Sequence, residues 1–261
     1  MGILKQLAVK AYRIVNPPNI FWKGEYPSWE AALGACGGYD ADAIIETVAN
    51  AARAVKNGKA TYERDGMLFY TTDYNWQLLY LLQKAARNRT QLTVLDFGGA
   101  LASQYFQNKA LFPAIPVTWV IVEQPKFVAI GRNEFETESL KFEFSLEEAL
   151  QKYAVDVCLF SSVLHYLENP KVFTAAVNAA RVPWIYVDRT AFSSREQIAV
   201  QHITRYVYEG SYPTRFFKEG TLPAYFPDYN VLATFRSDQE PDITLNGVPA
   251  FWQGFIFEVK N

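Results

Sequence analysis

Residues that build metal sites and disulfide frameworks are scarce in this sequence. Its 261 residues include two cysteines and two histidines. Cys36 and Cys158 are too few and too far apart for a disulfide framework or a cysteine-based zinc site. Two histidines likewise disfavour a His-rich metal centre. We therefore expect no metal and a reducing, cytoplasmic setting.

An excess of positive charge and a long apolar run are also missing. The formal net charge is −2, which disfavours a nucleic-acid partner. No apolar run reaches the length of a transmembrane helix. The first 15 residues, MGILKQLAVKAYRIV, place apolar residues at helical spacing with cations between them. They predict a helix that either packs on the domain or makes a peripheral contact with the inner face of the membrane.

Apolar and aromatic residues, by contrast, are plentiful. Half of the residues are hydrophobic and 16% are aromatic, which is enough for a substantial core. After residue 90, nearly continuous apolar runs alternate with helical stretches, which predicts a parallel sheet with right-handed crossovers. Two later strands have no helix between them and predict a C-terminal antiparallel hairpin. The expected strands are 92–97, 117–123, 140–144, 155–162, 184–189, 230–235 and 251–259.

This pattern divides the chain into two parts. We predict that residues 1–90 form a helical and loop extension packed on the core, and that residues 91–261 form a Rossmann-like α/β domain. An aromatic segment at about 190–229 is inserted in that domain. We find neither an internal repeat nor a low-complexity linker.

A glycine turn with the sequence DFGGALA follows the first strand of the sheet. In an open parallel sheet, ligands bind beyond the carboxyl ends of the strands, and glycine lets the backbone approach them closely. Glu123 ends the next strand, where an acid can accept hydrogen bonds from ribose hydroxyls. Gly98 and Gly99 are adjacent, unlike the G-x-G-x-x-G pattern, and Asp96 would repel a pyrophosphate but favour an ammonium and a sulfonium. These features disfavour an NAD-dependent oxidoreductase.

The glycine turn, the acid that ends the second strand and the terminal hairpin resemble class I S-adenosylmethionine-dependent methyltransferases. An ordered set of blocks is similar to a bacterial methyltransferase family associated with cell-surface polysaccharide genes. The resemblance implies a Rossmann-like class I methyltransferase sheet, S-adenosylmethionine as the cofactor and a role in polysaccharide biosynthesis. The general class I motif has a glycine where this chain has Ala102. The blocks are WKGEYPSWEAA, GGYD, LDFGGALASQYF, WVIVEQPKFVAIG, SSVLHYL, VDRT and VYEGSYPTRFF.

The resemblance extends the expected cofactor site beyond the glycine turn and Glu123. In class I methyltransferases the junction after the third strand borders the adenine, which suggests Phe144 and Ser145. The alternative is that Ser145 caps the helix that follows. We add Gln124, beside Glu123, and Ser161, at the end of the fourth strand.

Methyl transfer needs a nucleophile held in line and often a base that takes its proton. His165, just past the fourth strand, can accept a hydroxyl proton near neutral pH; the alternative is a histidine satisfied inside its own turn. Asp188, at the end of the fifth strand, is the second candidate base. Arg189 is a candidate clamp for a phosphate or carboxylate, and the alternative is that it pairs with Asp188 or with surface groups.

Aromatic and amide side chains in the inserted segment suit a sugar, which offers flat apolar faces and ring-edge hydroxyls. The alternative is that the tyrosines pack as core or as a lid. The candidates for substrate binding are Arg189, Gln201, Tyr208, Ser211, Tyr212 and, from the N-terminal block, Tyr26.

Together these observations predict a methyltransferase that uses S-adenosylmethionine to methylate a hydroxyl of a sugar or glycan precursor. The expected partner is a small-molecule or glycan acceptor. The alternative is a methyltransferase-like module that binds the cofactor, or a partner, without turnover.

Overall fold

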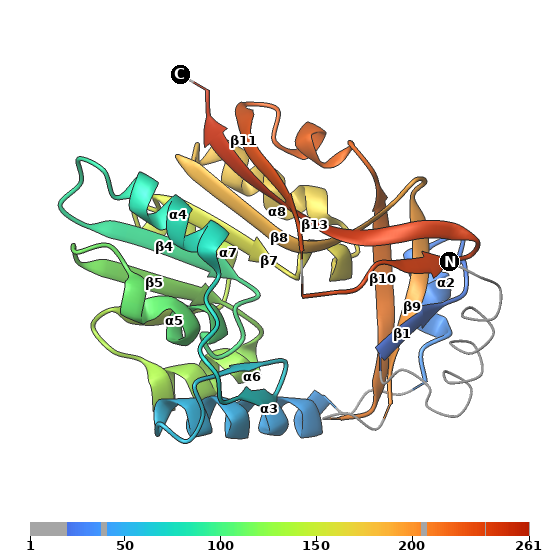
Figure 1. The fold of residues 1–261 in the computed structure, drawn as a ribbon, viewed down its shortest axis with the longest axis horizontal. Coiled ribbons are helices and arrows are strands. Elements are labelled where there is room, and N and C mark those ends of the chain that lie inside the picture. Colours follow the sequence, from blue (N-terminus) through green and yellow to red (C-terminus); the bar gives the residue numbers. More distant parts are fainter. Residues whose placement is uncertain (1–19, 38–40, 205–207, 238, 261) are drawn as a thin grey trace.

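The computed structural model describes residues 20–37, 41–204, 208–237 and 239–260 of the chain (Figure 1). The predicted amphipathic segment 1–15 lies outside these residues, so both alternatives for it stay predictions. In the described part of the chain, no helix has both the length and the apolar character to cross a membrane.

Seven strands of the large sheet follow the order β6-β5-β4-β7-β8-β13-β11. Neighbours among the first five are parallel, and β13 runs antiparallel to both β8 and β11. The predicted fold class, a Rossmann-like class I methyltransferase sheet with a C-terminal antiparallel hairpin, is therefore confirmed. The strands are β4 (Leu92–Phe97), β5 (Val117–Val122), β6 (Leu140–Glu143), β7 (Val157–Ser161), β8 (Trp184–Ser193), β11 (Tyr229–Arg236) and β13 (Val248–Val259).

Alternate residues of each central strand enter two separate cores, because successive side chains of a strand point to opposite faces. Val94 belongs to one core and its neighbour Leu95 to the other. On the face of Val94 lie α3 (Ala41–Lys56), α4 (Trp76–Ala85), α5 (Ser103–Asn108) and α6 (Pro125–Ile130). On the opposite face lie α7 (Leu146–Lys152) and α8 (Pro170–Ala179). Because α3 and α4 share a core with β4 and β5, residues before 90 complete one face of the sheet.

The predicted aromatic insertion forms strands. After β8, which runs beyond its predicted end, β9 (Gln197–Ile203) and β10 (Gly210–Lys218) form an antiparallel pair that β1 (Ile20–Lys23) extends. The pair joins the main sheet where Phe217 and Lys218 of β10 run parallel to the end of β8. The sequence indicated only loop around residue 20, because β1 exists through its pairing with β9. The nearest register partners in sequence, Lys23 and Val200, are 177 residues apart.

A small hairpin of β2 (Tyr62–Arg64) and β3 (Met67–Phe69) packs on α3 and α5. Asp65 and Gly66 form its two-residue turn with φ of 51° and 82°, the conformation that Asp-Gly favours in hairpins. Stacked rings of Tyr62 and Phe69, with centroids 4.5 Å apart, hold the two strands together. The hairpin therefore presents Glu63 and Asp65 at a fixed place beside the sheet.

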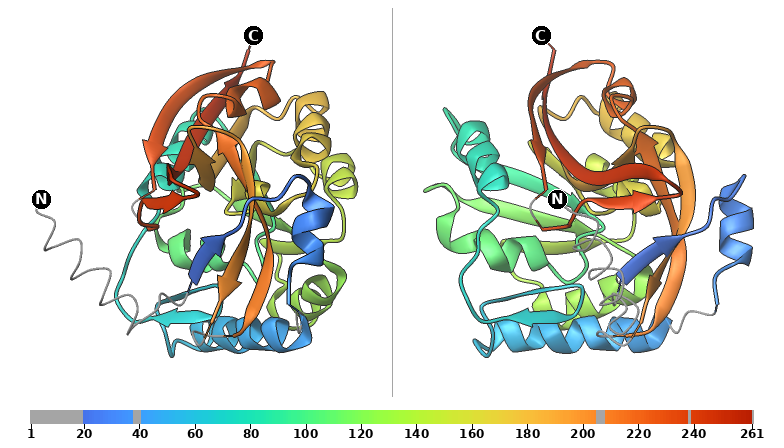
Figure 2. Two further views of the ribbon diagram at one scale, coloured as in Figure 1. Left: turned by 90° about the vertical axis from the view of Figure 1, so that its right-hand side faces the viewer. Right: turned by 45° about the vertical axis from the view of Figure 1, so that its right-hand side comes forward.

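The remaining elements are short. They are α2 (Trp29–Gly34), β12 (Ile243–Leu245), a π-helical turn η2 (Gly131–Phe135) and the 3₁₀ turns η1 (Lys109–Leu111), η3 (Leu164–Tyr166) and η4 (Leu222–Tyr225). The parallel strands β4, β5 and β7 point toward the side on which β9 and β10 stand (Figures 1 and 2). Their carboxyl ends thus share one edge, where a ligand of such a sheet binds.

Candidate functional site

The glycine turn is shaped by close backbone approaches. Gly98 has a φ of 75° and its N–H donates to Val122 O at 2.9 Å. A Cβ at Gly98 would lie 2.7 Å from Val163 Cγ2, and one at Gly99 would lie 2.7 Å from Asp96 Cγ. Only glycine therefore fits at either position without displacement of a neighbour.

Ala102, which stands where the general motif has a glycine, has a backbone conformation that favours glycine. Its φ is 73° and its ψ is 37°, in the left-handed region, and its side chain is fully buried. Left-handed backbone costs a non-glycine residue about 1–2 kcal/mol. The surrounding core offsets that cost, so the turn retains its path.

Asp96 lies under the turn and is nearly fully buried. Trp119 Nε1 donates to its Oδ2 at 3.2 Å. Burial raises the pKa of this carboxyl to about 7, and the charge of Glu123 adds to the shift while the Trp119 bond opposes it. Asp96 therefore supports the turn from below, and at neutral pH it is only partly charged.

Glu123 lies against the other side of the same turn. Its carboxylate accepts hydrogen bonds from the backbone N–H of Gln124, at 2.6 Å, and of Ala100. Burial raises its pKa, and both backbone bonds oppose that shift. The structure thus brings together the turn and the acid that the sequence placed at the end of β5.

Phe144 and Ser145, predicted at the adenine, and Gln124, predicted in the cofactor site beside Glu123, have different surroundings. Ser145 caps α7, because its Oγ accepts a hydrogen bond from Glu148 N at 3.1 Å; this is the second of the two alternatives. Phe144 is half exposed, and the guanidinium of Arg132 lies 4.6 Å from its ring centroid. Gln124 is exposed at the start of α6. Of these, Phe144 offers an accessible flat ring at the expected edge.

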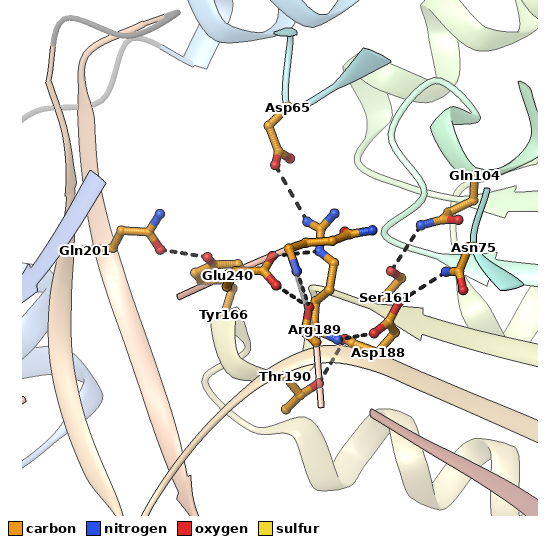
Figure 3. Close-up of polar contacts among 12 residues, drawn as sticks. Asp65, Asn75, Gln104, Ser161, Tyr166, Asp188, Arg189, Thr190, Gln201 and Glu240 are labelled. Atoms are coloured by element: carbon orange, nitrogen blue, oxygen red, sulfur yellow. Dashed lines mark hydrogen bonds and ion pairs between the residues drawn. The ribbon is translucent and has the colours of Figure 1, made fainter. Parts of the chain in front are cut away.

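Ser161, the last residue of β7, is the register partner of Asp188. Asp188 lies in the middle of β8 and not at its end as predicted, because that strand continues to Ser193 through its pairing with β13. Gln104 Nε2 of α5 donates to Ser161 Oγ at 3.4 Å. This contact links the helix after the glycine turn to the strand beside Asp188 (Figure 3).

Asp188 is 5% exposed and held by three donors. Asn75 Nδ2 and the Tyr186 hydroxyl donate to its Oδ2 at 3.2 and 3.0 Å, and Arg189 N donates to its Oδ1 at 2.7 Å. Burial raises the pKa of Asp188, while the Arg189 cation and these bonds oppose the rise. A carboxylate fixed in this way can accept a proton from a group placed beside its remaining lone pairs.

Arg189 lies next to it with a φ of 47° and 7% exposure. Its Nε is 3.1 Å from Glu240 Oε1, and an Nη atom is 3.7 Å from Asp65 Oδ2 (Figure 3). The geometry at Nε does not meet that of a hydrogen bond. Glu240 and Asp65 therefore balance the charge of the guanidinium. Its buried Nε still lacks a hydrogen bond, which a polar ligand could supply.

His165 is fully buried in η3, with its ring centroid 3.9 Å from that of Tyr166. Neither ring nitrogen has a hydrogen-bond partner among the described residues. Burial, aided by the Arg189 cation, lowers its pKa to about 3. A histidine with so low a pKa is a weak base near neutral pH, so the geometry favours Asp188 over His165 in that role.

The predicted substrate-binding residues divide into two groups. Gln201 Oε1 accepts a 2.6 Å hydrogen bond from the Tyr166 hydroxyl, whose ring packs edge-on against Tyr212 at 5.2 Å. Tyr208 is hydrogen-bonded to Tyr212. Ser211 and Tyr26 instead contact the N-terminal segment. Ser211 Oγ accepts a hydrogen bond from Gly37 N at 2.9 Å, and the ring of Tyr26 packs against Gly24.

Several residues of the site were missed by the sequence analysis. Gln104 and Tyr166 lie inside quoted blocks but were not singled out there, and the others lie in segments without a motif. The missed residues are Glu63 and Asp65 of the β2–β3 hairpin, Asn75, Gln104, Tyr166 and Glu240. Asn75 had one usable signal, since an Asn directly before a helical stretch predicts an N-cap. The other contacts join residues far apart in sequence.

The residues around the glycine turn fit a ligand that carries both a ribose and positive charge. At Gly98 and Gly99 the backbone lies too close to its neighbours for any side chain, and two acids, Asp96 and Glu123, lie against the turn. Among the residues that the structure describes, no group of His, Cys, Asp and Glu side chains could hold a metal ion.

No protein-family model matches the chain, and a search of curated proteins finds no match. Solved structures with similar folds include an S-adenosylmethionine-dependent methyltransferase from Clostridium acetobutylicum, at 13% identity, 72% coverage of this chain, 93% of that chain and a TM-score of 0.48. The N-terminal domain of EvdMO1, solved with SAH and D-fucose, has 12% identity, 80% and 95% coverage and a TM-score of 0.48. CalS10, an amino pentose methyltransferase from Micromonospora echinaspora, has 13% identity, 69% and 89% coverage and a TM-score of 0.43. At such values these likenesses carry no argument about function, and the fold assignment rests on the strand order.

Proposed function

We propose that the chain is a methyltransferase that uses S-adenosylmethionine to methylate a hydroxyl of a sugar or glycan precursor. The observation that carries the proposal is the shared edge at which the glycine turn and Glu123 lie beside Asp188 and Arg189. A donor site and an acceptor site are thereby adjacent, as in-line transfer requires.

The cofactor half of the site consists of the glycine turn with the two acids against it. Glu123 is placed to accept from ribose hydroxyls, and Phe144 to lie against the adenine. When bound, S-adenosylmethionine would supply an activated methyl group on a sulfonium. The cationic ligand would also offset the charge of Asp96, whose carboxyl is buried without an ion-pair partner among the described residues.

The acceptor half is formed by Asp188, Arg189 and the Tyr166–Gln201–Tyr208–Tyr212 cluster. These groups combine aromatic faces with hydroxyl, amide and guanidinium groups, which suits a polyhydroxylated acceptor. Arg189 would orient the acceptor through its guanidinium, whose Nε has no hydrogen bond among the described residues. Asp188 would take the hydroxyl proton as the oxygen attacks, and Tyr186 and Asn75 would hold the carboxylate in place.

Calorimetry first tests the cofactor. We expect S-adenosylmethionine and its demethylated product to bind and NAD not to bind. A screen of sugars and nucleotide sugars with radiolabelled cofactor then tests turnover. Binding without turnover of any acceptor would favour the alternative of a non-catalytic module, and absence of cofactor binding would refute the proposal.

Asp188→Asn tests the assigned base on the acceptor found in that screen. A positioned base contributes ~10²–10⁴-fold, so we expect kcat to fall by about that factor with cofactor affinity unchanged. Asp242→Asn, on an exposed carboxylate of the same charge, is the matched control. A kcat for Asp188→Asn equal to that of the control would remove the base assignment.

A further inference from the structure

The β2–β3 hairpin carries a buried carboxylate that the mechanism above does not use. Glu63 is only 3% exposed. Its carboxylate accepts hydrogen bonds from the Ser103 hydroxyl and from Gly66 N, the latter at 3.2 Å. Burial raises its pKa to about 7, and the Ser103 bond opposes the rise.

No cation of the described chain neutralises this carboxylate. The charged groups that act on it are Asp65 and Arg64 of its own hairpin. Asp65 is an anion, and the Arg64 guanidinium lies over the rings of Tyr62 and Phe69, 5.9 and 5.4 Å from their centroids. From α5, the facing group is the uncharged hydroxyl of Ser103. A buried acid in such surroundings is stabilised by any cation that reaches it.

Its position relates Glu63 to the cofactor half of the site. Ser103 is the first residue of α5 and directly follows Ala102, the end of the glycine turn. Two residues beyond Glu63, Asp65 pairs with Arg189 on the acceptor side (Figure 3). The hairpin therefore spans the edge of the sheet between the glycine turn and the acceptor cluster.

Glu123 and Glu63 contact different segments near the turn. Glu123 follows β5 and bonds to Ala100 N, whereas Glu63 accepts from the hydroxyl of Ser103, the first residue of α5. If Glu123 holds the ribose, the start of α5, which directly follows the glycine turn, would be placed to hold the amino-acid end of the cofactor. That end carries an ammonium group.

We propose that Glu63 binds the α-ammonium group of S-adenosylmethionine. The inference rests on the proposed function, because it requires that cofactor. It adds a cofactor-binding residue contributed by the N-terminal part of the chain, from a hairpin that no nucleotide-binding motif contains.

Three probes separate this role from other roles of Glu63. S-adenosylmethionine has both the ammonium and the sulfonium, S-adenosylhomocysteine has the ammonium only, and methylthioadenosine lacks the amino-acid end. Calorimetry should show that Glu63→Gln weakens the first two by a similar factor, about ten- to a hundredfold, the range for a lost charge-assisted hydrogen bond. Methylthioadenosine should bind the variant and the wild type equally.

Glu148→Gln is the matched control, because it makes the same substitution at an exposed glutamate of α7. It should leave the affinity for all three probes unchanged. If Glu63→Gln does not fold, as judged by thermal melting, Glu63→Asp retains the charge at a shorter reach and should lose affinity for the two ammonium-bearing probes only.

Three results would overturn the inference. Equal loss for methylthioadenosine would show that Glu63 only supports the turn. A larger loss for S-adenosylmethionine than for S-adenosylhomocysteine would assign Glu63 to the sulfonium, and unchanged affinities would exclude any contact. Failure of all three probes to bind the wild type would instead refute the proposed function, and the inference with it.

Discussion

Asn75 and Asp188, 113 residues apart in sequence, form a buried hydrogen bond of 3.2 Å between Nδ2 and Oδ2. The same Asn75 side chain caps α4, because its Oδ1 accepts from Leu78 N at 3.1 Å. One amide group thus fixes the start of a helix and the orientation of the candidate base.

Removal of this amide should change the pH dependence of catalysis. A donor to a carboxylate favours its charged form, so its loss raises the pKa of Asp188 and moves the acid limb of the kcat profile to higher pH. Asn75→Ser retains a cap for α4 but is too short to reach Asp188, so it should show this shift with little loss of stability. Asn75→Ala should show the shift and lose about 1 kcal/mol of stability with the cap. An unshifted profile in both variants would mean that Asn75 serves α4 only.

Glu123 should contribute to cofactor affinity through the ribose. Glu123→Ala removes an acceptor for two ribose hydroxyls, and we expect binding to weaken by roughly 1–3 kcal/mol. Calorimetry with S-adenosylmethionine measures it, with Glu148→Ala, on an exposed acid of α7, as the control. Equal affinity in Glu123→Ala and in the wild type would contradict the ribose assignment.

Asp96 should lower the stability of the free protein at neutral pH. Its folded pKa of about 7 is above the ordinary value of 3.8, so below about pH 4 both states hold the proton and the group has no effect. As the pH rises from 4 to 7, the unfolded chain releases the proton more easily, and folding loses stability until the folded carboxyl also ionises.

Asp96→Asn cannot ionise and avoids that loss. The free energy of unfolding of the variant minus that of the wild type, both without ligand, should therefore be larger at pH 8 than at pH 4 by a few kcal/mol. Urea unfolding at both pH values measures the difference, and the variant should bind S-adenosylmethionine more weakly. A pH-independent difference between the two proteins would show that the pKa of Asp96 is the same in the folded and the unfolded chain.

His165 should act through packing. With a pKa of about 3 it stays neutral between pH 5 and 8, so its titration should not appear in the rate profile. His165→Ala removes the ring that contacts Tyr166 and should cost roughly 1–3 kcal/mol in stability. His165→Gln should retain the shape of the pH profile. An acid limb that disappears in His165→Gln would restore His165 as the base and contradict the assignment to Asp188.

The sequence by itself determined the order and the type of the central elements. Each parallel strand is buried on both faces, so it appears as an apolar run whose residue types are constrained along its whole length. The strand predicted at 92–97 coincides with β4, and the predicted 117–123 differs from β5 by one residue. The glycine turn could also be predicted from the sequence, because its backbone tolerates few residue types at Gly98 and Gly99.

The tertiary structure decided which groups meet at the site. β1 is a strand because β9 offers it partners, and its four residues carry no pattern of their own. Glu63, Asp65 and Asn75 reach the site from the first 90 residues through contacts with Ser103, Arg189 and Asp188. Burial also distinguished the two candidate bases, because it lowers the pKa of His165 and raises that of Asp188. Solvent exclusion and long-range contacts set such properties, and neither is encoded in the local spacing of residues.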